Sequence, residues 1–451
     1  MKVFFVFRKG PNMLFSSITF LFYFFPIVLI LYFAVPQKFR NAILLIASLI
    51  FYGWGEPRFL IFMVISILAG YVIGLQLEKT ENPNKRKILL LISLFINLGM
   101  LGYFKYAGFF MKNFANKVVN IALPIGISFY TFQILSYVID VYRKNVKAQR
   151  SLIKLAAYIS MFPQRIAGPI VRYADLETQL DKRNYSFEKA MDGIRRFVIG
   201  LGKKVLLANQ LGELCAIYEK SQEQSMLFFL LNAVAFMLQI YFDFSGYSDM
   251  AIGLGKILGF DFMENFNYPY ISKSITEFWR RWHMSLGTWF RDYVYIPLGG
   301  NRKGAKRQIF NILVVWALTG FWHGADWNFL IWGLYFAVLL IVEKLFLLKK
   351  LEKSKVLGHI YTIILVMIGF VIFNGTTIAP MPISSPETIY YMKSYAPCLI
   401  MAMVGATPLV KKCVSRWKNT ILEPIALVII FLFVTAMLVN GSFNPFLYFR
   451  F

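Results

Sequence analysis

Long apolar stretches alternate with short basic segments along most of the chain. A membrane-spanning helix needs about 20 apolar residues. Eleven stretches are candidates for such helices: Leu14–Ala34, Asn41–Tyr52, Phe59–Leu77, Ile88–Phe104, Ala122–Val141, Leu227–Phe242, Ile309–Phe321, Leu330–Leu348, Ile360–Phe373, Tyr391–Val410 and Ile425–Val439. The pattern predicts an all-α polytopic membrane protein with about 10–12 transmembrane helices.

The middle of the chain, from Ala157 to Phe310, has a different pattern. Polar residues dilute the apolar ones there, and prolines and glycines interrupt the sequence repeatedly. Stretches this polar cannot face lipid, because exposed backbone groups and charges are costly in hydrocarbon. We therefore expect re-entrant or amphipathic helices that line a central cavity. A catalytic or transport centre would lie there, between two lipid-facing helix bundles.

Composition supports the membrane class. Of the 451 residues, 58% are hydrophobic and only 16% are charged, which excludes a water-soluble protein of this size. Lys and Arg outnumber Asp and Glu by 48 to 23, in short runs such as Lys85–Lys87 and Lys349–Lys355 between the apolar stretches. Basic loops of this kind face anionic membrane lipid, so they do not indicate nucleic-acid binding.

The ends and the cysteines add little chemistry. Cys215, Cys398 and Cys413 are scattered singly along the chain, which indicates neither a disulfide framework nor a metal site. Residues 1–12 are interpreted as an N-terminal extension before a single transmembrane domain over residues 13–451, with Met13 as an alternative start.

His323 is the first candidate for catalysis. It lies at the end of an apolar stretch, where an ionisable side chain is a functional candidate. Gly320 and Gly324 would leave room for a substrate to reach the ring, and Asp326 would orient it if the helix continues. The alternative is a core histidine bonded to a carbonyl group.

His283 is the second candidate. If residues 276–290 form one helix, Thr276, Arg280, His283, Gly287 and Phe290 share a face that would present cations and an imidazole to a cavity. Arginines there would bind an anionic group such as a phosphate. The alternative is an amphipathic helix on anionic lipid.

Two more predictions concern an ion pair near His283 and the third histidine, His359. Glu277 and Arg281 are spaced to pair at i,i+4 on the predicted helix. His359 follows a basic run and is interpreted as a solvated or interfacial histidine.

Three acids lie in or beside apolar segments: Asp140, Asp243 and Asp249. Buried carboxylates are costly unless they are paired, so we expect arginine partners and a structural or channel role, with direct catalysis as the alternative. The chain has no HExxH, phosphate-loop or GxSxG motif, so no metal, nucleotide or serine-nucleophile site is expected.

Several ordered motifs resemble the membrane-bound O-acyltransferase family, in its bacterial alginate and peptidoglycan O-acetyltransferase branch. The motifs are Tyr241–Gly255, Glu264–Tyr270, Glu277–His283, Arg291–Tyr293, Leu298–Arg302 and Trp322–Ala325, with Ser128–Gln133, Asp140–Arg143, Phe162–Gln164 and Gly168–Ile170 upstream. The resemblance covers the chain from about Met13 to its end.

The resemblance implies a ring of helices around a narrow central channel in the bacterial cytoplasmic membrane. The family's invariant histidine maps onto His323, and a second channel histidine maps onto His283. The motif residues expected to bind substrate are Arg280, Arg281, Trp282, Trp322 and Asn265. One departure is Phe336, which occupies a position where relatives usually carry histidine.

The resemblance also implies the reaction. Acetyl would pass from a cytoplasmic thioester, acetyl-CoA, to an extracytoplasmic polysaccharide acceptor with the help of a serine-esterase-like (SGNH-type) partner. The tail 446–451 resembles a Phe-x-Tyr-x-x-Phe motif in which the tyrosine, here Tyr448, is an acyl relay. An aromatic interfacial anchor is the alternative for the tail. Alternatives for the protein are a teichoic-acid-type D-alanyl transferase and a flippase without covalent chemistry.

Overall fold

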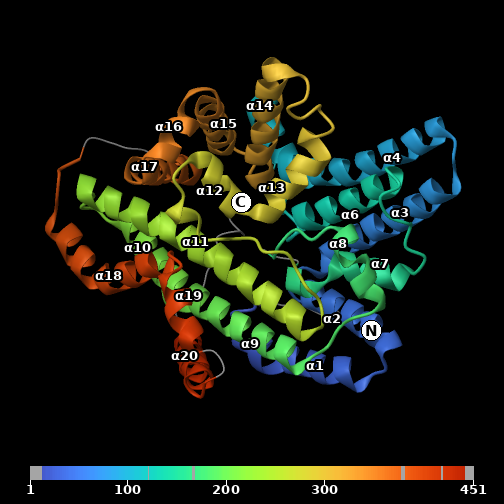
Figure 1. Cartoon of the computed structure of the whole chain (residues 1–451), viewed down its shortest axis with the longest axis horizontal. Helices are drawn as coiled ribbons and strands as arrows, with labels where there is room; N and C mark the ends of the chain where they lie inside the picture. The colour runs from blue at the N-terminus through green and yellow to red at the C-terminus, as the bar shows by residue number, and fades with distance from the viewer. Residues whose placement is uncertain (1–12, 120, 165–167, 377–380, 418–419, 442–451) are drawn as a thin grey trace. The chain divides into compact units, whose positions relative to one another are not determined.

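The computed structural model describes residues 13–119, 121–164, 168–376, 381–417 and 420–441. All regular secondary structure in these ranges is helical, as Figure 1 shows, and they contain no strand. The predicted all-α class is therefore confirmed. Residues 1–12 and the tail 446–451 lie outside the described residues.

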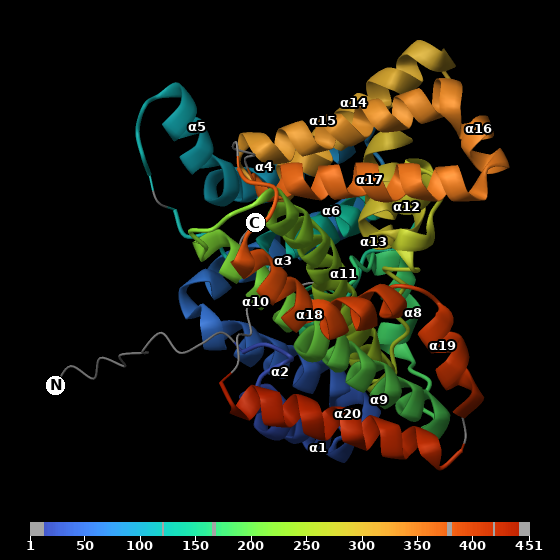
Figure 2. The same cartoon turned by 90° about the vertical axis from the view of Figure 1, so that its left-hand side faces the viewer.

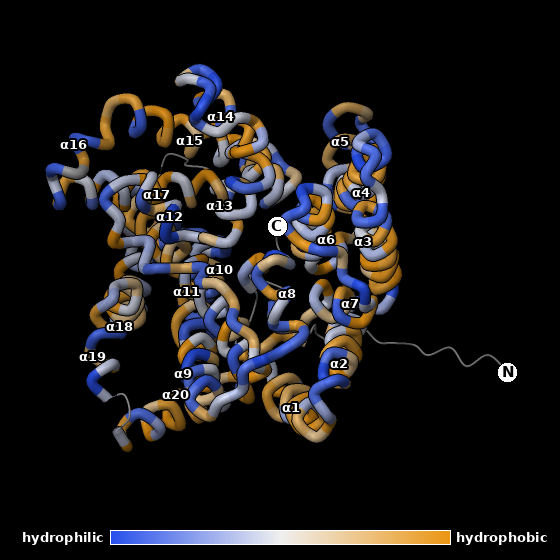
Figure 3. Tube along the Cα trace, turned by 45° about the vertical axis from the view of Figure 1, so that its right-hand side comes forward, coloured by the Kyte–Doolittle hydropathy of each residue, from blue (hydrophilic) through white to orange (hydrophobic). Residues whose placement is uncertain are grey.

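Six helices in the described ranges are long and apolar enough to cross a membrane: Pro57–Lys79, Pro83–Phe114, Met226–Ile257, Trp327–Leu351, Lys355–Asn374 and Leu422–Val439. A seventh span results if the bent pair Pro386–Gly405 and Leu409–Trp417 is counted as one. Figure 3 shows the hydrophobic residues that dominate α3 (Leu60–Lys79) and α4 (Pro83–Leu101).

Fewer helices qualify than the ten to twelve expected, because some predicted spans lie in short helices. α2 (Arg40–Gly55) and α6 (Ile127–Tyr142) each have 16 residues. At 1.5 Å per residue each is about 24 Å long, less than the roughly 30 Å of a hydrocarbon core.

The chain divides into two compact units. The first contains residues 13–164, 170–189 and 258–261. Its helices are α1 (Phe25–Ala34), α2, α3 (Leu60–Lys79), α4 (Pro83–Leu101), α5 (Ala107–Phe114), α6, α7 (Leu152–Ser160) and α8 (Tyr173–Asp181). Within this unit α3 packs against α4 and α6, and α2 packs against α7.

A buried arginine ties three helices of the first unit together. Arg86 of α4 donates hydrogen bonds to carbonyl oxygens at the end of α3, those of Leu77 and Thr80, and at the end of α6, those of Val141 and Tyr142. The last carbonyl groups of a helix have no partner within the helix, so the guanidinium caps two helix ends at once. Although it belongs to a basic run, this side chain is only 8% exposed.

The second unit contains residues 168–169, 190–257 and the described residues from 262 onward. Its helices are α9 (Phe187–Gly202, which begins in the first unit), α10 (Asn209–Lys220), α11 (Met226–Ile257), α12 (Ile275–Arg281), α13 (Met284–Phe290), α14 (Gly304–His323), α15 (Trp327–Val342), α16 (Leu348–Lys353), α17 (Lys355–Asn374), α18 (Pro386–Gly405), α19 (Leu409–Val414) and α20 (Leu422–Val439). Figure 2 shows α14, α15 and α17 lying side by side.

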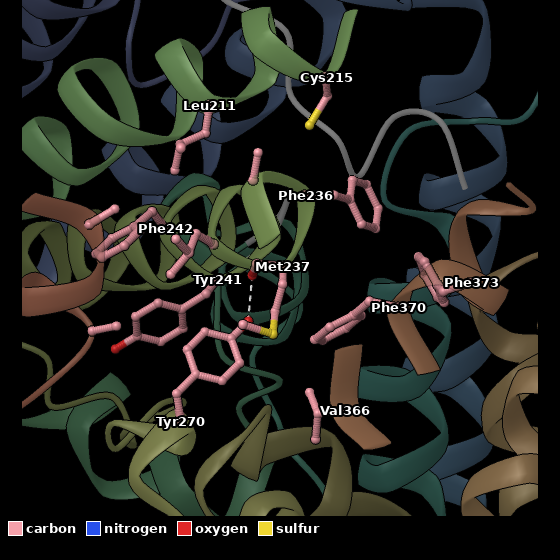
Figure 4. Close-up of a cluster of buried hydrophobic side chains, with 14 of the residues drawn as sticks. Leu211, Cys215, Phe236, Met237, Tyr241, Phe242, Tyr270, Val366, Phe370 and Phe373 are labelled. Atoms are coloured by element: carbon pink, nitrogen blue, oxygen red, sulfur yellow. Dashed lines mark hydrogen bonds between the residues drawn. The ribbon is translucent and has the colours of Figure 1, made fainter. Parts of the chain in front are cut away.

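Helix α11 is the centre of the second unit. It is long and apolar enough to span a membrane, yet 72% of its apolar 18-residue stretch is buried within the protein, against 6% for α20. This burial agrees with the expectation that the middle of the chain does not face lipid, but α11 is one continuous helix and not the re-entrant or amphipathic helix expected there. Buried hydrophobic side chains of α11 form a cluster with those of α10 and α17. Figure 4 shows Phe236, Met237 and Phe370 in this cluster. The hydroxyl of Tyr270 donates to the carbonyl oxygen of Met237 there.

Helices α9 and α11 cross through glycines. A Cβ atom on Gly246 would lie 2.8 Å from the carbonyl oxygen of Gly200, and one on Gly253 would lie 2.6 Å from that of Gly193. Backbone atoms cannot yield as a flexible side chain does, so both crossing points require residues without a side chain.

We predict that Gly246→Ala lowers the stability of the folded protein by about 1–3 kcal/mol, the usual cost of overpacking. Gly99→Ala is the matched control, because no atom of another described segment lies within 4 Å of a Cβ atom at that position of α4. Thermal unfolding in detergent measures both variants. Equal unfolding temperatures for the two would contradict the predicted tight crossing.

Candidate active site

His283 lies at a break between two short helices. The predicted continuous helix over residues 276–290 is wrong, because α12 ends at Arg281 and α13 begins at Met284. His283 itself has left-handed backbone angles, φ +45° and ψ +52°. Non-glycine residues adopt this conformation only where the surroundings impose it, and such positions cluster at functional sites.

Hydrogen bonds from the preceding loop impose this break. The backbone N–H of Met284 donates to the carbonyl oxygen of Asn265 over 3.0 Å, and the N–H of Asn267 donates to the carbonyl oxygen of Arg281 over 2.9 Å. The broken helix therefore satisfies its terminal backbone groups through the loop. His283 consequently does not share a helix face with Thr276, Arg280, Gly287 and Phe290.

Polar neighbours hold the buried side chain of His283, which is 2% exposed. Its Nδ1 lies 3.1 Å from Oδ1 of Asn265, which also accepts a 2.8 Å hydrogen bond from Oγ of Ser285. Asn265 in turn donates to Oγ of Ser248 on α11 over 3.0 Å. Burial lowers the pKa of His283 to about 3, so the imidazole is neutral.

His323 is the last residue of α14. Gly324 is extended, and Asp326 caps the next helix by accepting a 2.7 Å hydrogen bond from the backbone N–H of Trp327. The predicted orienting role of Asp326 required a continuing helix and is therefore wrong.

The space beside the two glycines near His323 is also filled. A Cβ atom on Gly324 would lie 2.1 Å from the Phe329 ring, and one on Gly320 would lie 2.3 Å from the Phe329 carbonyl oxygen. The glycines serve the close packing of α14 against α15, not substrate access as expected from the sequence.

Aromatic rings bring the two histidines into one site. The ring of Trp322 lies 5.8 Å from that of His283 and 5.0 Å from that of His323, measured between centroids. Trp332 and Phe373 contact His323 as well, at 5.0 and 5.3 Å, with nearly perpendicular planes. The structure therefore groups two of the predicted catalytic residues around a predicted substrate-binding residue.

The three predicted substrate-binding residues at the end of α12 differ in their exposure and partners. Arg281 pairs with Glu277, as predicted, through a 2.9 Å contact from Nε to Oε1. Arg280 is exposed. Trp282 is 4% exposed and stacks on Phe278 within the core.

The acids of α11 are paired, in part with lysines that sequence reasoning missed. Asp243 lies 2.7 Å from Nζ of Lys204, and both side chains are at most 4% exposed. Asp249 contacts Nζ of Lys203 at 2.7 Å and Arg196 at 2.9 Å. Both lysines belong to a π-helical turn, Lys203–Ala208, and their side chains extend to the acids of α11. Both acids are therefore paired, but the arginine partner predicted for them is present only at Asp249.

Asp140 lies in the first unit, at the end of α6, where its Oδ1 accepts a hydrogen bond from the Asn145 side chain. Tyr448, the predicted relay, lies outside the described residues.

Glu343 is a further residue that the sequence analysis missed. Its carboxylate is fully buried and accepts from the backbone N–H groups of Ile275 and Thr276 at 2.6 and 2.8 Å, and from the Thr276 hydroxyl at 2.7 Å. It therefore anchors the start of α12, the helix that leads to His283. The available signal was a lone acid inside the predicted span Leu330–Leu348.

The part of the chain that carries this site matches a known family. The sequence profile of the membrane-bound O-acyltransferase family matches residues 143–377, which is more than half of the chain. The chain belongs to the membrane-bound O-acyltransferase family. It is therefore an O-acyltransferase and a multi-pass membrane protein, as the motifs predicted.

Relatives support the membrane-bound O-acyltransferase assignment over most of the chain. "Probable alginate O-acetylase AlgI" of Azotobacter vinelandii is 43% identical over 378 residues, 80% of this chain and 75% of the relative. The peptidoglycan O-acetyltransferase of Helicobacter pylori is 33% identical over 74% of this chain and 70% of its own length. The teichoic acid D-alanyltransferase of Bacillus subtilis is 32% identical over 57% of this chain and 70% of its own length.

Proposed function

We propose that this O-acyltransferase takes acetyl from cytoplasmic acetyl-CoA and passes it across the bacterial cytoplasmic membrane to an extracytoplasmic cell-wall polysaccharide or exopolysaccharide. The observation that carries the proposal is the pair of histidines on either side of Trp322, within the residues that match the family. Relatives named for alginate and peptidoglycan O-acetylation indicate acetyl as the group transferred.

His323 is proposed as the general base. It takes the proton of the attacking hydroxyl as the new ester bond forms and the thioester C–S bond breaks, and it then gives this proton to the departing thiolate, so that CoA leaves as the free thiol. Trp322, Trp332 and Phe373 surround the ring at 5.0–5.3 Å. Aromatic faces attract a cation through their quadrupole, so these rings would stabilise the imidazolium formed in the transition state.

The donor would be held by other residues of the same segment. The neutral, buried His283 suits a contact with the thioester arm better than one with phosphates. Arg280 is exposed on α12, so its guanidinium is available to a phosphate. The charge of Arg281 is balanced by Glu277.

Tyr448 is proposed as a relay that carries acetyl as an aryl ester to a serine-esterase-like (SGNH-type) partner outside the membrane. A tyrosine hydroxyl has a pKa near 10 and is a weak nucleophile at neutral pH, so it needs the base that His323 supplies. A neutral acetyl group would then cross the membrane without its charged cofactor or the polymer.

We predict that Tyr448→Phe abolishes acetylation of the polymer in cells, because the phenylalanine has no hydroxyl to receive the acyl group. Intact mass of the purified protein after incubation with acetyl-CoA should show one acetyl adduct in the wild type and none in this variant. Polymer acetylation at the wild-type level in Tyr448→Phe would rule out the relay and leave the histidine assignments standing.

The donor experiment separates acetyl transfer from D-alanyl transfer, which the Bacillus subtilis relative makes the second candidate. Purified protein is supplied with acetyl-CoA or with a D-alanyl carrier protein, and free thiol release is measured. Release from acetyl-CoA alone supports the proposal, and release that requires the carrier protein supports the second candidate. A flippase would release thiol from neither donor.

A further inference from the structure

One nitrogen of the His283 ring has a partner and the other has none. Nδ1 lies 3.1 Å from Oδ1 of Asn265. Nε2 is buried and has no hydrogen-bond partner among the residues that the structure describes. A buried polar atom left unsatisfied costs about 1–3 kcal/mol, so it calls for an explanation in a folded protein. A ligand that bonds to Nε2 would supply one.

The orientation of the Asn265 amide decides what such a ligand must be. The backbone N–H of Ser285 can only donate, and it lies 3.3 Å from Oδ1 of Asn265. A flipped amide would set its own NH₂ against this donor and would lose the hydroxyl of Ser285, which donates to the same oxygen. Oδ1 therefore faces His283, and the NH₂ group faces Ser248.

The amide orientation in turn fixes the proton on the imidazole. Oδ1 of Asn265 is an acceptor, so Nδ1 of His283 must carry a hydrogen for the 3.1 Å contact to be favourable. The ring is neutral because it is buried. The remaining nitrogen, Nε2, then carries a lone pair.

We propose that Asn265 is a positioning residue that holds His283 as the Nδ1–H tautomer, so that Nε2 accepts a hydrogen bond from a neutral O–H or N–H group of a substrate. The identity of that substrate rests on the proposed function, whereas the tautomer does not. A lone pair repels a phosphate oxygen, so this position does not bind the phosphates of the donor.

Two groups that take part in the reaction can donate a hydrogen bond of this kind while remaining neutral. One is the hydroxyl that receives the acetyl group, and the other is an amide N–H of the pantetheine arm of CoA. The His283 ring that would bind either group lies 5.8 Å from the ring of Trp322, and Trp322 in turn lies 5.0 Å from His323. The tautomer would thus hold a reactant within the group of rings that contains the proposed base.

Nitrogen NMR of the imidazoles tests the tautomer directly. The chain has only three histidines, so protein labelled with ¹⁵N-histidine gives few signals. His359→Gln removes the exposed histidine, and the spectrum of His323→Ala then assigns His283. We expect a protonated Nδ1 and an unprotonated Nε2 for His283. A proton on Nε2, or on both nitrogens at pH 7, would overturn the proposal.

A pair of Asn265 variants tests the positioning role. Asn265→Leu removes the acceptor at nearly constant size, and we expect it to lose the Nδ1–H tautomer and to lower acetyl transfer by about tenfold or more. Asn265→Asp keeps an acceptor facing Nδ1 and should keep the tautomer and more of the activity. An unchanged tautomer in a folded Asn265→Leu variant would overturn the role, and so would loss of the tautomer in Asn265→Asp.

Two small probes identify the bound group. Reduced CoA carries the pantetheine amides, and p-cresol carries a phenolic hydroxyl. We expect one of them to shift the Nε2 resonance of His283 in the wild type and not in Asn265→Leu. The probe that acts names the source, and a resonance that neither probe moves overturns ligand binding at Nε2. If acetyl-CoA were not the donor, the tautomer would persist while the CoA experiment alone failed.

Discussion

His323→Ala is expected to lower the rate of thiol release from acetyl-CoA by about 10²–10⁴-fold, the usual contribution of a positioned general base. The imidazole is the group proposed to take the hydroxyl proton, and alanine offers no replacement. Trp322, Trp332 and Phe373 remain in place around the cavity left by the ring. The loss should therefore appear in kcat more than in the KM for acetyl-CoA.

Two variants control this measurement. His359→Ala removes an exposed histidine at the start of α17 and should leave the rate unchanged. His323→Gln keeps a polar side chain but is a poor base, and it should be nearly as slow as alanine. A glutamine variant with the wild-type rate would show that polarity at this position is sufficient and would eliminate the general-base role.

Asp243→Ala is expected to destabilise the protein by about 3–5 kcal/mol, because it leaves the ammonium group of Lys204 buried without its carboxylate. The two side chains are 4% and 2% exposed and lie 2.7 Å apart. The buried thiol of Cys215 provides the measurement: it reacts with a fluorogenic thiol reagent when the second unit unfolds. Replacing Cys398 and Cys413 by serine removes the background from the more accessible thiols.

A matched ion pair and a double variant decide whether burial is the cause. Asp261→Ala breaks the contact with Lys189 in the first unit, where the aspartate is 64% exposed, and should cost at most about 1 kcal/mol. Lys204→Met combined with Asp243→Leu removes both charges and should recover much of the stability. Equal losses for the two single variants would contradict the burial argument.

Both histidines of the site were predicted from the sequence, but the break in the helix at His283 was not. Only three histidines occur in the chain, and two lie in polar segments beside apolar stretches. The break in the helix was not predictable from periodicity, because residues 276–290 have a helical pattern and the hydrogen bonds that break it come from Asn265 and Asn267. Contacts between segments override local pattern in this case.

The sequence predicted that the buried acids have cationic partners, but it did not predict which residues these are. The cost of burying Asp243 and Asp249 required cations, and arginine was expected. Lys203 and Lys204 were not considered; they lie in a π-helical turn, where Lys203 pairs with Asp249 and Lys204 pairs with Asp243. Such a turn has no reliable sequence signal.

The glycine crossing of α9 and α11 limits how the protein can move. Gly193 opposes Gly253 and Gly200 opposes Gly246, so the two helices are antiparallel and interlock at points seven residues apart. A slide of one turn would drive side chains into backbone at both points, so ratcheting of α9 along α11 is sterically barred. Ser248, which bonds Asn265, lies between these points on α11. A gating motion of the second unit that required α9 to slide along α11 is therefore excluded, and the residues of α11 that support the site keep their register against α9.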